Sequence, residues 1–194
     1  MTRLFFGIEL SSEVRDALTS QVKRLQMDGV QAGNWSRPEL YHITAVFLGD
    51  LSEAWLEKLR RVARAAVAEV PAFQLALGNL GMFPKNRILF AQLQEGTGTT
   101  QLAELVHALN RELAAICFSD LDTRPYRPHI TLARKLNVPS IYSEDVKGQP
   151  IVGLTPLPAI QFTVDGLCLF ASTRVDGRLS YPVMERFAFS PHNT

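Results

Sequence analysis

Two short stretches repeat the residues histidine, isoleucine and threonine, and they hold the side chains best suited to chemistry. One stretch is HITAVFLG, which begins at His42, and the other is HITLAR, which begins at His129. The chain has four histidines, so half of its imidazoles lie in this one pattern. Self-similarity of this kind often marks a structural unit that is used twice.

The first stretch is rich in β-branched and aromatic residues and is predicted to be a strand. Residues two apart on a strand face the same side, so His42 and Thr44 would share one face. By the same alternation Ile43, Ala45 and Phe47 would point to the other face. The strand therefore offers an imidazole beside a hydroxyl.

The second stretch has the same pattern, with His129 and Thr131 on one face and Leu132 on the other. Arg134 lies five residues after His129, so strict alternation points it away from the histidine. It would reach the site only if the strand ended or twisted there. If the two stretches are related by a pseudo-two-fold axis, their polar pairs could face each other across a cleft.

Two opposed imidazoles are suited to concerted proton transfer, because their ordinary pKa lies near working pH. Cleavage of a phosphodiester needs such a pair, since water must lose a proton while the departing oxygen gains one. The two threonine hydroxyls could then donate hydrogen bonds to the phosphoryl oxygens. This chemistry requires no metal ion or other cofactor.

Other functions of the repeated histidines fit the sequence less well. A metal site needs at least one more ligand, and neither stretch places Cys, Asp, Glu or another His at chelating spacing. No serine lies in a GxSxG-like turn, and phosphate-loop and dinucleotide motifs are absent. A purely structural role remains an alternative, in which each imidazole is a core residue bonded to a carbonyl, although apolar residues would fill that role at lower desolvation cost.

The elements that must position the two stretches also repeat. Residues 4–10 are strand-like, Ser11 to Glu13 can cap a helix, and the apolar spacing from Val14 to Leu25 predicts an amphipathic helix that ends near Gly29. A loop that contains residues 34–38 then leads to the first HIT strand. A second strand begins at Ile88, and a helix over residues 102–116 and a loop lead to the second HIT strand. The unit strand, helix, strand is thus used twice.

The remaining segments predict a mixed α and β protein with mainly antiparallel sheets. A helix is expected between the two units, after Ser52, and a hairpin is expected around the GMFPKN segment. The region from Lys135 to Pro158 is expected to be a loop. Residues 160–172 and 179–189 are expected to form a last hairpin, joined by a turn at Asp176 and Gly177.

Composition excludes several classes of protein. The chain has 194 residues, 46% of them hydrophobic, and a formal net charge of +1, so no global positive field favours long nucleic acid. No segment approaches a membrane span and the first residues do not resemble a signal peptide, so a cytoplasmic location without membrane contact is expected. Cys117 and Cys168 are expected to be buried free thiols.

Local charge near the second stretch favours a small anionic ligand. Four cations lie there with no acidic residue between positions 123 and 135: Arg124, Arg127, Arg134 and Lys135. Aromatic side chains that could stack on a base are Trp35, Phe47 and Tyr126. We therefore expect a nucleotide end in a cleft, with Arg127, Arg134, Phe47 and Tyr126 as binding residues.

At this point the residues carry a resemblance to a known family. HITAVFLG and PHITLAR resemble the paired HxTx motifs of the two-histidine (2H) phosphoesterase superfamily. LFFGIEL and RPYRPHITLAR resemble its bacterial and archaeal branch, the LigT/ThpR family of RNA 2′,3′-cyclic phosphodiesterases, also named 2′-5′ RNA ligases. The resemblance covers nearly the whole chain. It implies a monomeric α+β domain over residues 1–194, with two intertwined, pseudo-symmetric lobes around a central cleft and helices outside.

The resemblance also implies roles for individual residues. His42 would donate a proton to the leaving 3′ oxygen and His129 would accept one from water, while Thr44 and Thr131 hold the phosphate. Arg134 matches a family arginine associated with phosphate or nucleotide binding. The implied substrates are RNA ends or small nucleotides with a 2′,3′-cyclic phosphate, the product is a 2′-phosphomonoester, and reversible 2′-5′ ligation is a further expected activity.

Two other functions stay open at the level of sequence. One is a non-catalytic protein that binds RNA ends or nucleotides, against which the two intact histidines argue. The other is a 2H enzyme that acts on a different cyclic phosphate or on a 2′-5′ linked oligonucleotide, because loops rather than motifs determine the substrate.

Overall fold

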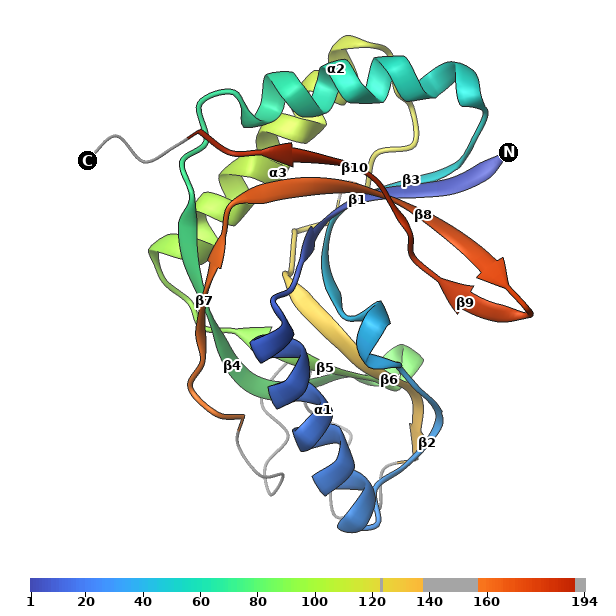
Figure 1. Cartoon of the computed structure of the whole chain (residues 1–194), viewed down its shortest axis with the longest axis vertical. Helices are drawn as coiled ribbons and strands as arrows, with labels where there is room; N and C mark the ends of the chain where they lie inside the picture. Colours follow the sequence, from blue (N-terminus) through green and yellow to red (C-terminus); the bar gives the residue numbers. More distant parts are fainter. Residues whose placement is uncertain (123, 138–156, 191–194) are drawn as a thin grey trace.

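Two curved antiparallel sheets form the frame of the computed structural model, and the helices lie on their outer sides (Figure 1). The structure describes residues 1–122, 124–137 and 157–190. Most of the loop predicted between Lys135 and Pro158 lies outside the described residues. The α+β class with two antiparallel sheets, predicted from the sequence, is confirmed.

The first sheet contains the first HIT strand at one edge. Its order is β10-β8-β1-β3, and β9 pairs with the end of β8. The strands are β1 (Thr2–Glu9), β3 (His42–Leu51), β8 (Gly166–Val175), β9 (Arg178–Ser180) and β10 (Val183–Ala188).

The second sheet contains the other HIT strand, and its order is β2-β6-β5-β4-β7. The strands are β2 (Gln31–Trp35), β4 (Phe73–Phe83), β5 (Ile88–Leu93), β6 (His129–Asn137) and β7 (Gln161–Val164). In both sheets the HIT strand pairs antiparallel with the strand that opens its repeat, β1 with β3 and β5 with β6. The predicted repeat of a strand-helix-strand unit is therefore confirmed.

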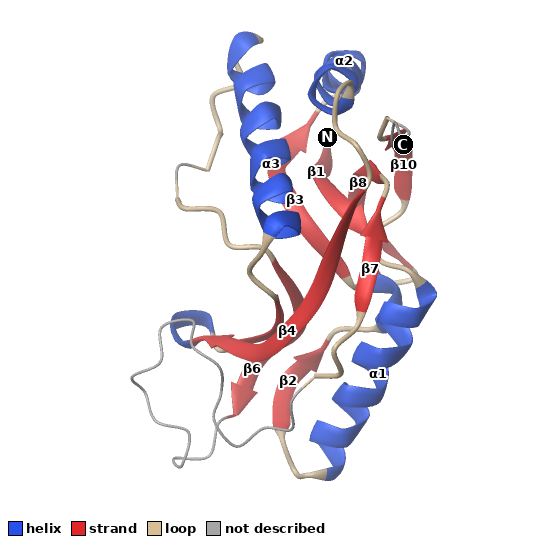
Figure 2. Cartoon of the chain, turned by 90° about the vertical axis from the view of Figure 1, so that its left-hand side faces the viewer, coloured by secondary structure: helices blue, strands red, loops and turns tan. Residues whose placement is uncertain are grey.

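Three helices connect the strands: α1 (Ser12–Met27), α2 (Leu56–Val67) and α3 (Thr97–Ala115). Short 3₁₀ helices precede β3 (η1, Pro38–Leu40), α2 (η2, Glu53–Trp55) and β5 (η3, Pro84–Asn86). Ser11 caps α1 by accepting a hydrogen bond from the backbone N–H of Val14. Figures 1 and 2 place α1 beside the second sheet and α2 and α3 beside the first.

Two of the three helices, α1 and α3, reach the sheet opposite to that of the strand before them. α1 follows β1 of the first sheet but lies beside the second (Figure 2), and α3 follows β5 of the second sheet and contacts both β4 of that sheet and β3 of the first. Both sheets also contribute to one hydrophobic core, which includes Leu4 and Phe6 of β1 and Ile130 of β6. The two lobes are intertwined and share this core.

Strand β2 differs from the sequence prediction, which places residues 34–38 in a loop. Its sequence, QAGNW, has only short or polar residues before Trp35 and contains no buried residue, so it lacks the alternation that marks a strand. It forms because β6 offers it an open edge, with Asn34 opposite Arg134 and Trp35 opposite Ala133.

The predicted last hairpin is partly wrong. Residues 160–172 do not form one strand, because the chain changes sheets at Asp165: β7 pairs with β4, and β8 pairs with β1. Both segments are strand-forming, so their residue types do not reveal the change of sheet. The turn at Asp176 and Gly177 is confirmed, since both residues have positive φ and β8 pairs with β9 across them.

The two cysteines differ from each other in burial. Cys168 is a buried free thiol of β8, as predicted. Cys117 is exposed, so the prediction that it is buried is wrong. It follows the end of α3 in the left-handed region, with φ of 57°, and is exposed although the next residue, Phe118, is buried in the core.

Candidate active site

Each HIT strand contains a β-bulge three residues after its histidine. In the first lobe Thr44 pairs with Gly7 and Val46 pairs with Phe6, which leaves Ala45 without an opposite residue. An extra residue of this kind shifts the alternation of the strand by one position. Val46 and Phe47 therefore face the sides opposite to those predicted from simple alternation, up to a second register shift at Leu48.

The second lobe has its bulge at the equivalent position. Thr131 pairs with Phe90 and Ala133 pairs with Leu89, so Leu132 has no opposite residue. The bulge turns Arg134 to the side of His129, where strict alternation would have placed it on the far side. The arginine reaches the site by this change in the strand.

Phe47 is the counterpart of Arg134 in the first lobe, five residues after His42. It lies opposite Phe5 on β1, and the Phe5 ring centroid is 4.8 Å from that of His42 and 6.2 Å from that of Phe47. The prediction that Phe47 points away with Ile43 and Ala45 is wrong, because the bulge reverses its side. The Phe47 side chain is 61% exposed, so its ring lies at the rim of the site.

The two imidazoles are held by the same hydrogen bond in both lobes. His42 Nδ1 lies 2.7 Å from the carbonyl of Leu40, and His129 Nδ1 lies 2.8 Å from the carbonyl of Arg127. Because a carbonyl can only accept, each Nδ1 carries a hydrogen and the neutral ring keeps its lone pair on Nε2. The Thr44 hydroxyl lies 3.0 Å from His42 Nε2 and donates to it.

Aromatic rings enclose the His42 imidazole. Besides Phe5, the Tyr181 ring meets it edge-on at 5.1 Å and the Phe170 ring lies at 6.0 Å. Rings packed around an imidazole remove water from it and limit its rotation. None of these three residues is predicted from the sequence as part of the site, because their proximity depends on the pairing of β1 with β8 and on the turn after β9.

The His129 imidazole has a similar but smaller enclosure. Phe83 meets it edge-on at 5.0 Å and Phe90 lies at 5.4 Å. Phe83 comes from β4 and Phe170 from β8, strands that occupy the same position in their sheets. The two lobes therefore repeat the ring behind the histidine as well as the histidine itself.

Glycines make room for these rings on the neighbouring strands. A Cβ atom at Gly7 would lie 2.8 Å from the carbonyl oxygen of Ile43 and 3.3 Å from the Phe170 ring. A Cβ atom at Gly81 would lie 2.6 Å from the Phe90 ring. Any side chain at either position would push the ring or the HIT strand away, so the histidine surroundings depend on both glycines.

Burial lowers the pKa of both histidines below the ordinary value. The positive charge of Arg134 lowers both further, and the charge of His129 also opposes protonation of His42. These effects outweigh the backbone carbonyls, which favour the charged rings. In the free protein at neutral pH both imidazoles are therefore neutral.

The other predicted binding residues have different positions. The Tyr126 hydroxyl donates to the carbonyl of Thr44 at 2.9 Å and its ring packs against the core, so Tyr126 connects the loop before β6 to β3. The Arg127 side chain is exposed, and Thr131 is half-buried on β6 beside His129. Trp35 also packs against the core.

The positive charge near the second stretch is smaller than predicted. Arg124 forms a salt bridge with Asp122, which lies just outside the segment without acidic residues. Arg127, Arg134 and Lys135 form no salt bridge within residues 1–122, 124–137 and 157–190. Three of the four predicted cations are therefore free to meet an anion.

The described residues contain neither a cluster of metal ligands nor a membrane-spanning helix. In the described part of the chain no three His, Cys, Asp or Glu side chains gather where they could hold a metal ion. No helix within that same part has the length and apolar character needed to cross a membrane.

The fold and the site together define a class of protein. It is a bilobal α+β protein with one HxT strand in each sheet. The two strands, β3 and β6, contact each other and bring two imidazoles and two threonines together. This is the arrangement of the two-histidine phosphoesterases. The sequence model of the 2′-5′ RNA ligase superfamily matches residues 11–176, and the chain belongs to that superfamily.

Individual relatives agree with this membership. A curated RNA 2′,3′-cyclic phosphodiesterase of Thermus thermophilus is 32% identical over 197 residues, which cover 96% of this chain and 89% of the relative. One of the same name from Geobacillus stearothermophilus is 32% identical over 137 residues, and the match spans only 41% of that relative's length. The crystal structure of E. coli LigT complexed with NADP+ has a TM-score of 0.75 at 26% identity, covering 97% of this chain and 98% of LigT.

Proposed function

We propose that the protein hydrolyses RNA 2′,3′-cyclic phosphate ends to 2′-phosphomonoesters by acid–base catalysis that requires no metal or cofactor. The observation that carries this proposal is the matched pair of imidazoles, each with Nδ1 bound to a backbone carbonyl, so that Nε2 is the atom left to transfer a proton. The Thermus and Geobacillus relatives are both named RNA 2′,3′-cyclic phosphodiesterases, which supports this class of substrate.

In the proposed reaction the two Nε2 atoms have opposite tasks. His129 accepts a proton from water as the water oxygen bonds to phosphorus. The bond between phosphorus and the 3′ oxygen breaks, and protonated His42 donates its proton to that oxygen. The 2′ oxygen keeps its bond to phosphorus, so the product is a 2′-phosphomonoester and the two histidines have exchanged protonation states.

The substrate itself helps to set these protonation states. Both imidazoles have lowered pKa in the free protein, and one must be charged for the reaction. An anionic phosphate between them offsets the charge of Arg134 and favours one imidazolium, which raises the pKa of the pair on binding. The buried surroundings strengthen this effect because the local dielectric is low.

The remaining residues are assigned to binding. Thr44 and Thr131 donate hydrogen bonds to the phosphoryl oxygens, and for this the Thr44 hydroxyl turns from His42 Nε2 toward the substrate. Arg134 and the exposed Arg127 provide positive charge for the phosphate, and Phe47 provides a ring for the terminal base. Tyr126 supports Thr44 through its carbonyl, while direct stacking of Tyr126 on a base stays a prediction.

The same two proton transfers would also allow the site to ligate RNA. If the 5′-hydroxyl of a second RNA replaces water, His129 accepts its proton and the same 3′ oxygen leaves. The product is then a 2′-5′ linkage, which corresponds to the description of the superfamily. Hydrolysis is favoured in our proposal because water is always present at high concentration.

The decisive experiment uses purified protein with RNA that ends in a 2′,3′-cyclic phosphate, in excess EDTA. We expect turnover to the 2′-phosphate, since every catalytic task is assigned to protein groups. Activity that only an added divalent metal restores would contradict the acid–base proposal. Tight binding without turnover would favour the non-catalytic alternative, and turnover of other cyclic phosphates or 2′-5′ oligonucleotides alone would favour the other 2H reaction.

A further inference from the structure

A groove lies between the segment before His42 and the β8–β9 hairpin, and the reaction proposed above gives it no role. Its volume is about 530 Å³. One wall is the segment that leads into β3, with Arg37 and Glu39, and the other is the β8–β9 hairpin, with Val175, Arg178 and Ser180. Two segments far apart in the sequence thus enclose a surface large enough for a ligand.

Both walls of the groove end at the candidate active site. Arg37 precedes η1, and the carbonyl of Leu40 at the end of η1 holds His42. Ser180 of the hairpin is followed by Tyr181, whose ring meets His42 edge-on at 5.1 Å. Along both walls the chain therefore leads from the groove directly to residues that contact His42.

Arg37 joins the two walls. Its guanidinium donates to the carbonyl of Leu179 on the hairpin and pairs with Glu39 at 3.0 Å. Glu39 thereby fixes the guanidinium in place instead of presenting a free negative charge. A planar guanidinium fixed in this way keeps further N–H donors for an anion.

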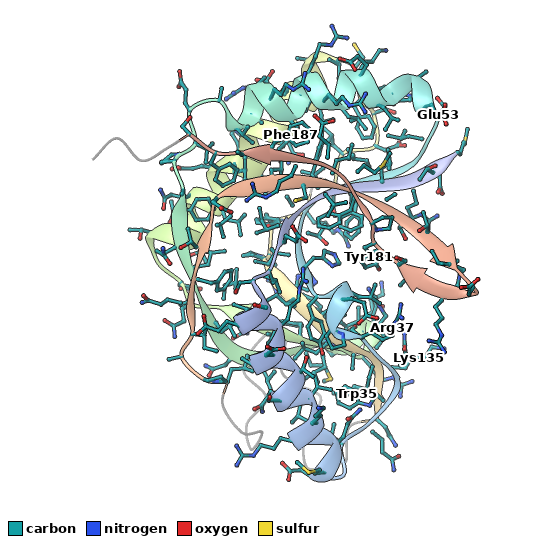
Figure 3. The ribbon with its side chains drawn as sticks, in the orientation of Figure 1. Trp35, Arg37, Glu53, Lys135, Tyr181 and Phe187 are labelled. Atoms are coloured by element: carbon teal, nitrogen blue, oxygen red, sulfur yellow. The ribbon has the colours of Figure 1, made fainter. Side chains whose placement is uncertain are left out.

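The groove also contains one further arginine, Arg178, and one further acidic residue, Asp176. Arg178 is exposed and, like Lys135 and Arg134, has no salt bridge in the part of the chain that the structure describes. Asp176 lies at the tip of the hairpin turn. Figure 3 shows Tyr181, Arg37 and Lys135 following one another along one side of the molecule in that view. Val175, which is 58% exposed, adds an apolar side chain.

We propose that this groove binds the single-stranded RNA that precedes the cyclic phosphate, with Arg37 and Arg178 each contacting a backbone phosphate. The inference rests on the proposed function, because it extends the substrate from one terminal nucleotide to the strand behind it. Guanidinium groups at intervals, with apolar and hydroxyl side chains between them, suit a chain of alternating phosphates and bases. The small number of cations agrees with a grip on a few nucleotides and with the low net charge of the protein.

The test compares two substrates that differ only in length: a 2′,3′-cyclic mononucleotide and an RNA of about ten nucleotides with the same end. Wild-type protein should have a higher kcat/KM for the RNA. Arg178→Ala should lower kcat/KM for the RNA about threefold to tenfold and leave the mononucleotide unchanged. Arg178→Glu should lower it more. The slope of log kcat/KM against log salt for the RNA should become shallower by about 0.7 for each phosphate that the protein no longer neutralises.

Arg61→Ala is the matched control, because Arg61 is an exposed arginine of α2 on the outer side of the first sheet. It should change neither substrate. Arg37→Lys keeps the charge but loses the planar fork, so it should affect the RNA alone and less than Arg37→Ala does. The unfolding temperature of each variant shows whether the substitution has destabilised the fold.

This experiment tests the proposed RNA binding by the groove and the proposed reaction separately. Turnover of the mononucleotide reports the proposed reaction, and the ratio of the two substrates reports the groove. Equal losses for both substrates in Arg178→Ala, or no loss for the RNA, would overturn the proposed binding of the strand. If neither substrate were turned over, binding of a labelled RNA by wild type and Arg178→Glu would decide, and equal affinity would overturn it.

Discussion

The two lobes use the same backbone device with different side chains. Each has a histidine, a threonine two residues later, a bulge three residues after the histidine, and a fifth residue that the bulge turns toward the site. That fifth residue is Phe47 in the first lobe and Arg134 in the second. The repeated residues are suited to the reaction, while the residue that differs gives the site a direction.

The surroundings of the two histidines also differ, with more aromatic contacts in the first lobe than in the second. His42 has three rings around it and a hydrogen bond to Thr44, whereas His129 has two rings and no side-chain hydrogen bond within the described residues. A symmetric cleft could hold a cyclic phosphate in either of two orientations. In the proposed reaction we expect the aromatic side and the cationic side to remove this ambiguity, because a base favours the first and a phosphate favours the second.

The strongest test of the comparison is to remove one imidazole at a time. His42→Ala and His129→Ala should each lower the rate of hydrolysis by about a hundredfold to ten-thousandfold, the usual contribution of one general acid or base. Stopped assays with RNA ending in a cyclic phosphate measure this. Near-full activity together with a large drop in unfolding temperature would favour a structural role for the histidine.

A change of leaving group then separates the two roles. A cyclic substrate whose departing oxygen needs no protonation should rescue His42→Ala but not His129→Ala, because only the acid has become dispensable. Rescue of His129→Ala instead would reverse the assignment of acid and base and keep the class of reaction.

Arg134→Ala should have the next largest effect, about a tenfold to hundredfold loss in kcat/KM, since a charge-assisted bond to phosphate is removed. It should also raise the pKa of both histidines, because the arginine charge lowers both. Measuring the pH dependence of kcat/KM would show this as a shift of the profile to higher pH. Arg134→Lys is the control, which should keep the pH profile and recover part of the activity.

Thr44→Val and Thr131→Val should each cost about tenfold, less than loss of a histidine, because one hydrogen bond to the phosphate is removed. The two variants should differ in their pH profiles, since only Thr44 bonds to a histidine ring. Parallel kinetic and pH measurements check both statements, and identical profiles would argue against a role of Thr44 in setting the state of His42.

Phe47→Ala should have a smaller effect, about fivefold to tenfold in kcat/KM, because its ring is largely exposed. The loss should depend on the base of the terminal nucleotide, whereas the loss in Arg134→Ala should not. Phe47→Tyr keeps the ring and is the matched control. A loss in Phe47→Ala that is equal for all bases would contradict its assignment to the base.

The smallest expected effect concerns stability and pH. Both histidines have lowered pKa in the folded protein, so their neutral forms contribute stability that is fully present above the ordinary histidine pKa of about 6.5. This contribution is lost as the pH falls below that value, because the unfolded chain then binds protons more readily. Between about pH 7.5 and about pH 5.5 the wild type should lose more in unfolding temperature than the double variant His42→Gln and His129→Gln. Equal losses would contradict the lowered pKa values.

The sequence predicts the part of the site that repeats and misses the part that depends on pairing. His42, Thr44, His129 and Thr131 can be found because their spacing appears twice on strand-like segments. The bulges cannot be found, because Ala45 and Leu132 are ordinary strand residues and only the register with β1 and β5 leaves them unpaired. Simple alternation consequently places Phe47 on the wrong face.

The fold shows the same division. α1, α3 and the HIT strands follow from local periodicity and capping, so the sequence predicts them. β2 depends on an open edge of β6, and the break at Asp165 depends on which sheet each segment joins. The rings of Phe170 and Tyr181 reach His42 through these long-range pairings, so no local signal could identify them.

The path of the chain between the sheets bears on how the molecule moves. Between the described strands the chain passes from one sheet to the other after β1, β2, β3 and β7. Two lobes can open around a hinge only if few chain segments connect them, because each connecting segment must bend at the hinge. These crossings tie the two sheets together, so we expect the two lobes to keep a fixed separation when a ligand binds.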